Sequence, residues 1–175
     1  MAPSNKLLEK LTGGDRRSIG RAEEVVDLVH KQPALLAELI HGLHAADPLV
    51  RMRAADAAEK VSLQQPDLLR PFKAQLLSLL DEAEQQEVRW HLAQMVPRLS
   101  LSKKECGRAA SAFRRYLEDR SSIVKACALQ GLADLAMQER SLLPQTKALL
   151  QDSVIRGTAA MKARARKLLR QLEAD

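Results

Sequence analysis

The sequence predicts an all-α protein of about four helical hairpins, with one further helix capping their N-terminal end. The first observation is compositional: alanine and leucine are abundant, and only 2% of the residues are aromatic. This composition supplies few of the residues that favour strands, and it disfavours sites built on aromatic stacking. The second observation is a short motif that recurs every 31 to 38 residues. The third is that each copy opens a segment whose apolar residues follow the helical period.

The recurring motif begins with an acid and continues, after two residues, with a β-branched residue and a base. Its clearest copies are Asp47-Pro-Leu-Val50-Arg51 and Asp152-Ser-Val-Ile155-Arg156, each followed after two residues by Ala-Ala. Shorter copies stand at residues 87–89 and 123–125. Because a two-helix unit of this length is typical of helical repeat arrays, we expect a helix, a short acidic turn and a helix to occur four times.

Each hairpin is expected to have a first helix that ends before the turn and a second helix that starts at the motif. First helices are predicted near residues 33–40, 68–80, 103–118 and 142–150, and second helices from about residues 47, 87, 123 and 152. A helix near residues 16–31 stands in front of them. Residues 1–14 are expected to form a frayed lead-in, and residues 15–175 a single repeat domain.

Local capping signals agree with these boundaries. Asp47 is expected to cap a helix whose first residue is Pro48, where a missing amide donor costs nothing. Ser102 and Glu105 have the spacing of a capping box, in which each side chain accepts from the other's backbone amide. Pro97 is expected to kink or end its helix, because proline removes one helical hydrogen bond.

These motifs resemble HEAT repeats, a family of helical hairpins that stack into solenoids. The resemblance covers roughly residues 33–172, with residues 16–31 as a half-repeat cap. It implies a right-handed α-solenoid in which the second helix of each pair lines a concave face. In that family the turn acid and the following base tend to form a ladder between repeats. By resemblance, a structural role is therefore expected for Asp47, Arg51, Arg89, Lys125, Asp152 and Arg156.

Charge is distributed unevenly along the chain. The net charge is +6; residues 1–97 carry −2, whereas residues 98–175 carry +8. Much of the excess lies in two helical stripes at four- and seven-residue spacings: Lys104, Arg108 and Arg115, then Lys162, Arg166 and Arg170. Such stripes are typical both of solvated helices and of surfaces that follow phosphates through salt-sensitive contacts. Binding of nucleic acid or another anionic surface is therefore one alternative function.

No catalytic or metal-binding pattern is found in the sequence, so we expect no enzyme activity, no cofactor and no metal. Of the four histidines, His41 and His44 share a helix face, but no third ligand accompanies them. Cys106 and Cys127 lack a Cys-x-x-Cys pattern and are expected to be free thiols in a reducing compartment. With no secretory signal and no long apolar run, the sequence predicts a soluble, cytoplasmic protein.

The predicted concave row favours a different function. Aligning the second helices places three groups in register: Arg53, Asp56 and Lys60; His91, Gln94 and Arg98; Cys127, Gln130 and Asp134. Because this surface mixes charge signs and hydrogen-bonding groups, it suits a peptide or protein partner better than a phosphate backbone. We therefore expect a monomeric, non-catalytic protein-interaction module whose contacts come from the first two groups. A regulatory or chaperone-like subunit of an enzyme would look the same.

Overall fold

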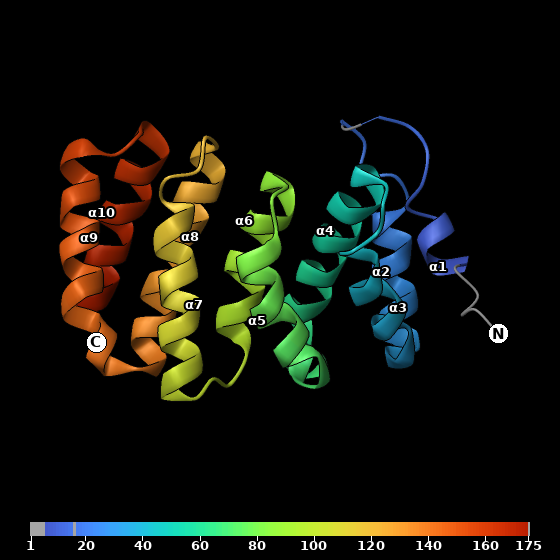
Figure 1. The fold of residues 1–175 in the computed structure, drawn as a ribbon, viewed down its shortest axis with the longest axis horizontal. Helices are drawn as coiled ribbons and strands as arrows, with labels where there is room; N and C mark the ends of the chain where they lie inside the picture. The colour runs from blue at the N-terminus through green and yellow to red at the C-terminus, as the bar shows by residue number, and fades with distance from the viewer. Residues whose placement is uncertain (1–5, 16, 175) are drawn as a thin grey trace. The chain divides into compact units, whose positions relative to one another are not determined.

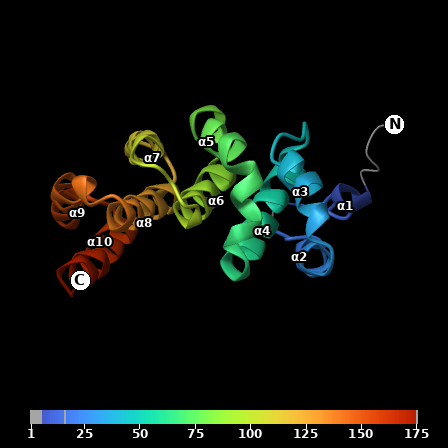
Figure 2. The same cartoon turned by 90° about the horizontal axis from the view of Figure 1, so that it is seen from below.

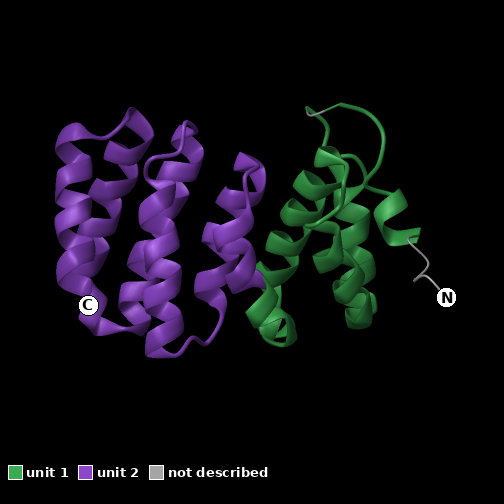
Figure 3. Ribbon diagram, in the orientation of Figure 1, with its two compact units in different colours: residues 1–75 green, residues 76–175 purple. Residues whose placement is uncertain are grey.

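A computed structural model describes residues 6–15 and 17–174 of the chain. The protein is all-α and 81% helical, with ten α-helices in the described part, and its helices pack mostly on their neighbours. It forms two compact units, residues 1–75 and residues 76–175, where the sequence predicts one domain over residues 15–175 (Figure 3). Each unit has its own buried apolar side chains.

The first unit gathers its helices around one long helix. Its α-helices are α1 (Lys6–Glu9), α2 (Ala22–Lys31), α3 (Leu36–Gly42) and α4 (Pro48–Gln64). Short 3₁₀ turns, η1 (Pro33–Leu35) and η2 (Pro66–Phe72), precede α3 and the next helix. Both α2 and α3 pack on α4, and α1 packs on α3.

The second unit consists of three successive hairpins. They are α5 (Lys73–Glu82) with α6 (Gln86–Met95), α7 (Lys103–Tyr116) with α8 (Ser122–Gln138), and α9 (Leu143–Arg156) with α10 (Ala159–Ala174). Two 3₁₀ turns, η3 (Val96–Arg98) and η4 (Arg140–Leu142), lie between hairpins. Within this unit α6, α8 and α10 form one layer, and α5, α7 and α9 form a second layer beside it (Figures 1 and 2).

Helix α8 is the centre of the second unit, because it packs against α6, α7, α9 and α10. Nine of its residues are buried, and most of them are alanine, glycine or leucine. At Gly131 a Cβ atom would lie 2.7 Å from the Phe113 ring and 2.8 Å from the Ala93 carbonyl oxygen. Because neighbouring helices approach α8 this closely, α8 is rich in small residues and has little amphipathic character.

The predicted capping signals are confirmed. The Asp47 side chain accepts a hydrogen bond from the Leu49 amide at 2.8 Å, and Pro48 is the first residue of α4. Ser102 and Glu105 form the capping box of α7. Helix α6 ends at Met95, and Pro97 lies in the 3₁₀ turn that follows. Each of these predictions depends only on residues close in sequence.

The predicted start of the last second helix, at Asp152, is wrong. Helix α9 continues through Asp152 to Arg156, these two side chains pair within the helix, and Ile155 is 73% exposed. The turn lies instead at Gly157, where a Cβ atom would come within 2.4 Å of the Ser153 carbonyl oxygen. Thr158 then caps α10 by accepting from the Met161 amide at 3.3 Å. The 152–156 copy of the motif is therefore not a turn.

The N-terminal segment also differs from the expected frayed lead-in. Residues 1–5 lie outside the described residues, but Leu7, Leu8 and Leu11 are buried. The Glu38 carboxylate accepts hydrogen bonds from the Leu7 amide at 3.0 Å and the Leu8 amide at 3.4 Å. Residues 6–11 therefore belong to the first unit, because α1 covers apolar surface on α3.

The close approach at Gly131 can be tested by adding one methyl group. Gly131→Ala is expected to lower the free energy of unfolding by about 1–3 kcal/mol, because overpacking against backbone outweighs the gain in helix propensity. Gly107→Ala is the matched control, since nothing lies within 4 Å of a Cβ atom at Gly107 on α7. The control is expected to gain about 0.5–1 kcal/mol. Urea unfolding measures both; an equal gain in both variants would contradict the packing.

Candidate functional site

Arg53, predicted to contact a partner, is instead a core residue of the first unit. Its side chain is only 1% exposed. The guanidinium donates to four backbone carbonyl oxygens at 2.6–3.1 Å, those of Leu11, Gly13, Asp15 and Ser18. The carbonyl dipoles stabilise the buried charge, and the four hydrogen bonds fix Leu11, Gly13, Asp15 and Ser18 to α4. Arg53 is therefore not accessible to a partner in this fold.

The remaining predicted contacts of the first unit are occupied by ion pairs. The Lys60 ammonium lies 3.0 Å from the Asp56 carboxylate, one helical turn away, and also pairs with Glu23 on α2. Burial acts to lower the pKa of Lys60, but the hydrogen bonds to Glu23 and Asp56 outweigh it and the pKa is raised. These residues therefore tie α2 to α4.

In the second unit, two of the predicted contacts line a common hollow. Gln94 on α6 and Arg98 on η3 border a space of about 280 Å³. The other residues around it are Pro97, Gln130, Asp134 and Arg164. The predicted contact His91 does not line this hollow; its ring packs edge-on against Trp90, with ring centres 5.7 Å apart. Most of its lining side chains are charged or amides, and they come from four elements: α6, η3, α8 and α10.

A second hollow of about 370 Å³ adjoins the first, because Gln130 and Asp134 line both. Its further lining residues are Ala133, Met137, Leu168, Gln171 and Leu172. Leu168 and Leu172 belong to the buried core between α8, α9 and α10, whereas the Met137 side chain is 39% exposed. The two hollows together, lined by η3, α6, α8 and α10, are called the α8 groove below.

A chain of hydrogen bonds crosses the α8 groove. The Arg164 guanidinium donates to the Gln130 side-chain oxygen at 2.8 Å, and the Gln130 amide donates to the Asp134 carboxylate at 2.8 Å. Burial raises the pKa of Asp134, against the opposing effects of the Gln130 hydrogen bond and the charges of Arg98 and Arg164. With two guanidiniums and one carboxylate, the polar hollow carries a net charge of +1.

Arg164 is a groove residue that is not among the contacts predicted from the sequence. It stands two residues from both Lys162 and Arg166. Residues two positions apart in a helix are separated by about 200° around the helix axis. Arg164 therefore faces away from the stripe that contains Lys162 and Arg166. That angular relation was available in the sequence. The partner Gln130, 34 residues away, was not, because pairing α8 with α10 requires the folded unit.

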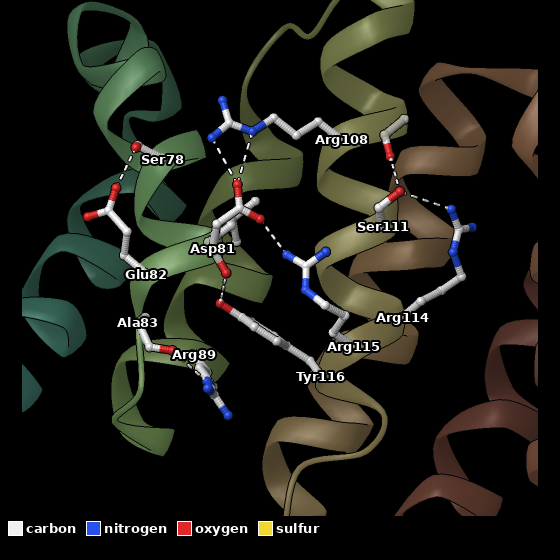
Figure 4. Close-up of polar contacts among 12 residues, drawn as sticks. Ser78, Asp81, Glu82, Ala83, Arg89, Arg108, Ser111, Arg114, Arg115 and Tyr116 are labelled. Atoms are coloured by element: carbon white, nitrogen blue, oxygen red, sulfur yellow. Dashed lines mark hydrogen bonds and ion pairs between the residues drawn. The ribbon is translucent and has the colours of Figure 1, made fainter.

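The basic stripe on α7 is partly neutralised within the second unit. Arg108 donates to one Asp81 oxygen at 2.9 and 3.1 Å, and Arg115 pairs with the other oxygen (Figure 4). Burial acts to raise the pKa of Asp81, but the hydrogen bonds from the two arginines prevail and lower it. Of the three predicted stripe residues, Lys104 alone has no ion pair with a described residue.

The stripe on α10 is different. Arg166 and Arg170 are exposed and Lys162 is half-buried. None of the three pairs with a carboxylate among residues 6–15 and 17–174. The predicted anion-binding residues therefore split into an α7 set that holds α5 to α7 and an α10 set that faces solvent.

The thiols and histidines add no reactive cluster in the described part of the chain. Cys106 is buried, and burial raises the pKa of its thiol, with a smaller effect from Glu139 and Glu105. Cys127 is half-buried, and neither cysteine forms a disulfide within the described residues. Within the described ranges, no three histidine, cysteine or acidic side chains converge as metal ligands. No helix of these ranges is long and apolar enough to cross a membrane.

Comparisons with known proteins give this chain no relative: no protein-family model matches it, and neither does any curated protein.

Replacing Arg53 tests its role in the first unit. Arg53→Met is expected to lower the free energy of unfolding by about 3 kcal/mol, since four backbone carbonyl groups lose a buried donor. It should also speed trypsin cleavage after Arg17. Lys60→Met on the same helix removes a partly exposed charge and is expected to cost less than about 1 kcal/mol. Equal stability and equal cleavage of the two variants would contradict the anchoring role.

Burial of Asp134 predicts a pH dependence of stability. Because burial raises the pKa of Asp134 above its ordinary value, the folded protein holds this proton more tightly than the unfolded chain. As the pH rises from about 4, the wild type therefore loses stability relative to Asp134→Asn, until the folded carboxyl has ionised. Arg98, Arg164 and Gln130 surround the group in both proteins. Urea unfolding at a series of pH values measures the difference, which a solvated carboxylate would leave constant.

Proposed function

We propose that this chain is a non-catalytic protein-interaction module that holds a peptide segment of its partner in the α8 groove. The observation that carries the proposal is the pairing of two hollows along the same helix, both bordered by Gln130 and Asp134. One is lined mostly by charged and amide side chains, and the other adds four apolar side chains; they are called the polar and the apolar hollow. Peptide sites combine apolar burial, which supplies affinity, with a few polar groups that fix orientation. From the predicted row, Gln94 and Arg98 remain as contacts.

We further propose that the hairpins are HEAT-like and belong to a right-handed solenoid. In the second unit, the alternation of α5 to α10 between two layers supports this (Figure 2). Arg89 supports it as well, because it donates to the Ala83 carbonyl oxygen at 2.7 Å and pairs with Asp119 of the next hairpin at 2.6 Å. That contact is one rung of the ladder that the resemblance implies. In the first unit, Arg51 similarly donates to the Ala45 and Ala46 carbonyl oxygens.

Several features favour a peptide over a nucleic acid. The groove contains a carboxylate and an apolar floor, both of which disfavour a phosphate backbone. The α7 cations Arg108 and Arg115 share Asp81, which reduces the positive field of that stripe. Among the described stripe residues, Lys104 and the α10 cations are without an ion pair, and the described residues that line the groove include no aromatic side chain to stack a base. Nucleic-acid binding is therefore the competing outcome of the test.

A peptide library displayed on phage, selected against the full chain, tests the proposal. Selected peptides are expected to bind in fluorescence anisotropy and to lose about tenfold or more in affinity with Met137→Glu, which places a charge in the apolar hollow. Ile123→Glu is the matched control, since Ile123 is also an exposed apolar residue of α8 but does not line the groove. It should bind as the wild type does.

Two results would overturn the proposal. One is that no peptide is selected, or that Met137→Glu and Ile123→Glu bind the selected peptides equally well. The other is that labelled DNA or RNA binds instead, weakens steeply between about 50 and 200 mM salt, and is released by Arg166→Glu with Arg170→Glu but not by Met137→Glu. That double variant is expected to leave peptide affinity unchanged.

A further inference from the structure

We infer that the α8 groove selects segments in which a carboxylate stands within about two residues of an apolar side chain. The inference rests on the proposed function and adds the chemistry of the ligand. The carboxylate would occupy the polar hollow bordered by Arg98 and Arg164, and the apolar side chain the hollow beside Met137. A side-chain carboxylate and a chain terminus share this chemistry, and the experiment below separates them.

The balance of charge in the polar hollow favours an anion. Its only described carboxylate, Asp134, already accepts from Gln130 and faces two guanidiniums. A basic ligand would have to compete with these donors for Asp134 and would meet the positive charges of both arginines. An acidic ligand meets a net charge of +1 instead. The whole of residues 76–175 carries 17 lysines and arginines against 12 acids, so the long-range field also attracts an anion.

Arg164 supplies donors with a defined orientation. A guanidinium has five N–H groups, and the bond to Gln130 uses one nitrogen, Nη1. Because Gln130 is itself held by Asp134, this bond fixes the direction of the guanidinium plane. A positioned guanidinium binds a carboxylate through two parallel hydrogen bonds. Gln94, which also lines the hollow, adds a further polar group, and its side-chain nitrogen donates to the Trp90 carbonyl oxygen at 3.2 Å.

The apolar hollow lies one helical turn along α8. Met137 follows Asp134 by three residues, which is a rise of about 4.5 Å. Residues two apart in an extended peptide point to the same face and lie about 6.5–7 Å apart, so one residue between the acid and the apolar side chain lets both side chains face the groove. Leu172 and Leu168 form an apolar floor, and the flexible Met137 side chain adapts to what it covers.

A designed set of fluorescein-labelled nonapeptides tests this inference. The reference peptide has a central Glu, a Leu two residues later and an amidated C-terminus. Three amidated partners carry Gln or Lys for Glu, or Ser for Leu. A shorter peptide with Gln for Glu ends in a free carboxylate after the Leu. The reference peptide is expected to bind about tenfold tighter than each of its three amidated partners. Binding of the shorter peptide alone would assign the carboxylate to a chain terminus, which also supports the inference.

Two variants of the protein are expected to change the affinity for the reference peptide in opposite directions. Arg164→Gln is expected to weaken the reference peptide about tenfold, whereas Asp134→Asn is expected to tighten it several-fold, because a nearby negative charge is removed. Arg170→Gln removes the same charge from the solvent side of α10 and should change affinity less than about twofold, which controls for net charge.

The failure of this inference differs from the failure of the proposed function. If the Gln or Lys peptide binds as tightly as the reference, and Met137→Glu still abolishes binding, the selectivity is wrong and the peptide groove remains. Weaker binding in Asp134→Asn would likewise overturn the selectivity. If neither these peptides nor any selected from the library depends on Met137, the groove binds no peptide and both proposals fall.

Discussion

The packing of α8 on four other helices is the constraint on which the second unit depends. A helix surrounded in this way has to be small and apolar almost all round, and nine of its residues are buried. The backbone approach at Gly131 and the alanines beside it bring α6, α7 and α10 close to one axis. What remains accessible on α8 is a narrow strip, and Gln130, Asp134 and Met137 lie along it at helical spacing. The groove is therefore a consequence of packing, because it forms along the strip of α8 that the neighbouring helices leave uncovered.

Electrostatics in this unit are decided by where its carboxylates lie. Asp81 at the end of α5 draws Arg108 and Arg115 of α7 into contacts that connect two hairpins, so these cations hold the structure together (Figure 4). Asp134 lies in a hollow where Arg98 and Arg164 outnumber it, so positive charge is left over at a concave surface. Arg166 and Arg170 face solvent without such partners among the described residues. Counting basic residues along a helix treats these three groups alike, although their surroundings give them three different roles.

This contrast explains which features were predictable from the sequence. Helix class and most boundaries follow from short-range physics: the Asp47 cap, the capping box of Ser102 and the break at Pro97 involve residues only a few positions apart. The features that the sequence did not predict depend on contacts between residues far apart in the chain or on packing. Arg53 stands three residues after Val50 and four before Ala57, within the apolar stripe of α4, but its carbonyl partners are 35 to 42 residues away. Residues 152–156 have the residue types of the turn motif, but the turn lies at Gly157, where a Cβ atom would not fit, and Thr158 caps the next helix. Gln94 and Arg98 were predicted as contacts, whereas Arg164 needed the pairing of α8 with α10.

The two halves of the groove differ in rigidity, and this difference has a consequence for recognition. The polar half is held by bonds in series, from Arg164 to Gln130 to Asp134, on helices that pack directly on one another. Donors fixed in this way lose little freedom on binding, so a misplaced or missing charge in the ligand is penalised in full. The apolar half ends in Met137, an exposed side chain with three rotatable bonds that can follow ligands of different shape. On the proposed binding mode, the groove therefore discriminates strictly at the charged position and loosely at the apolar one. A partner surface would keep its acid in place while varying the apolar residue beside it, because only the first of these two contacts is made by a preorganised network.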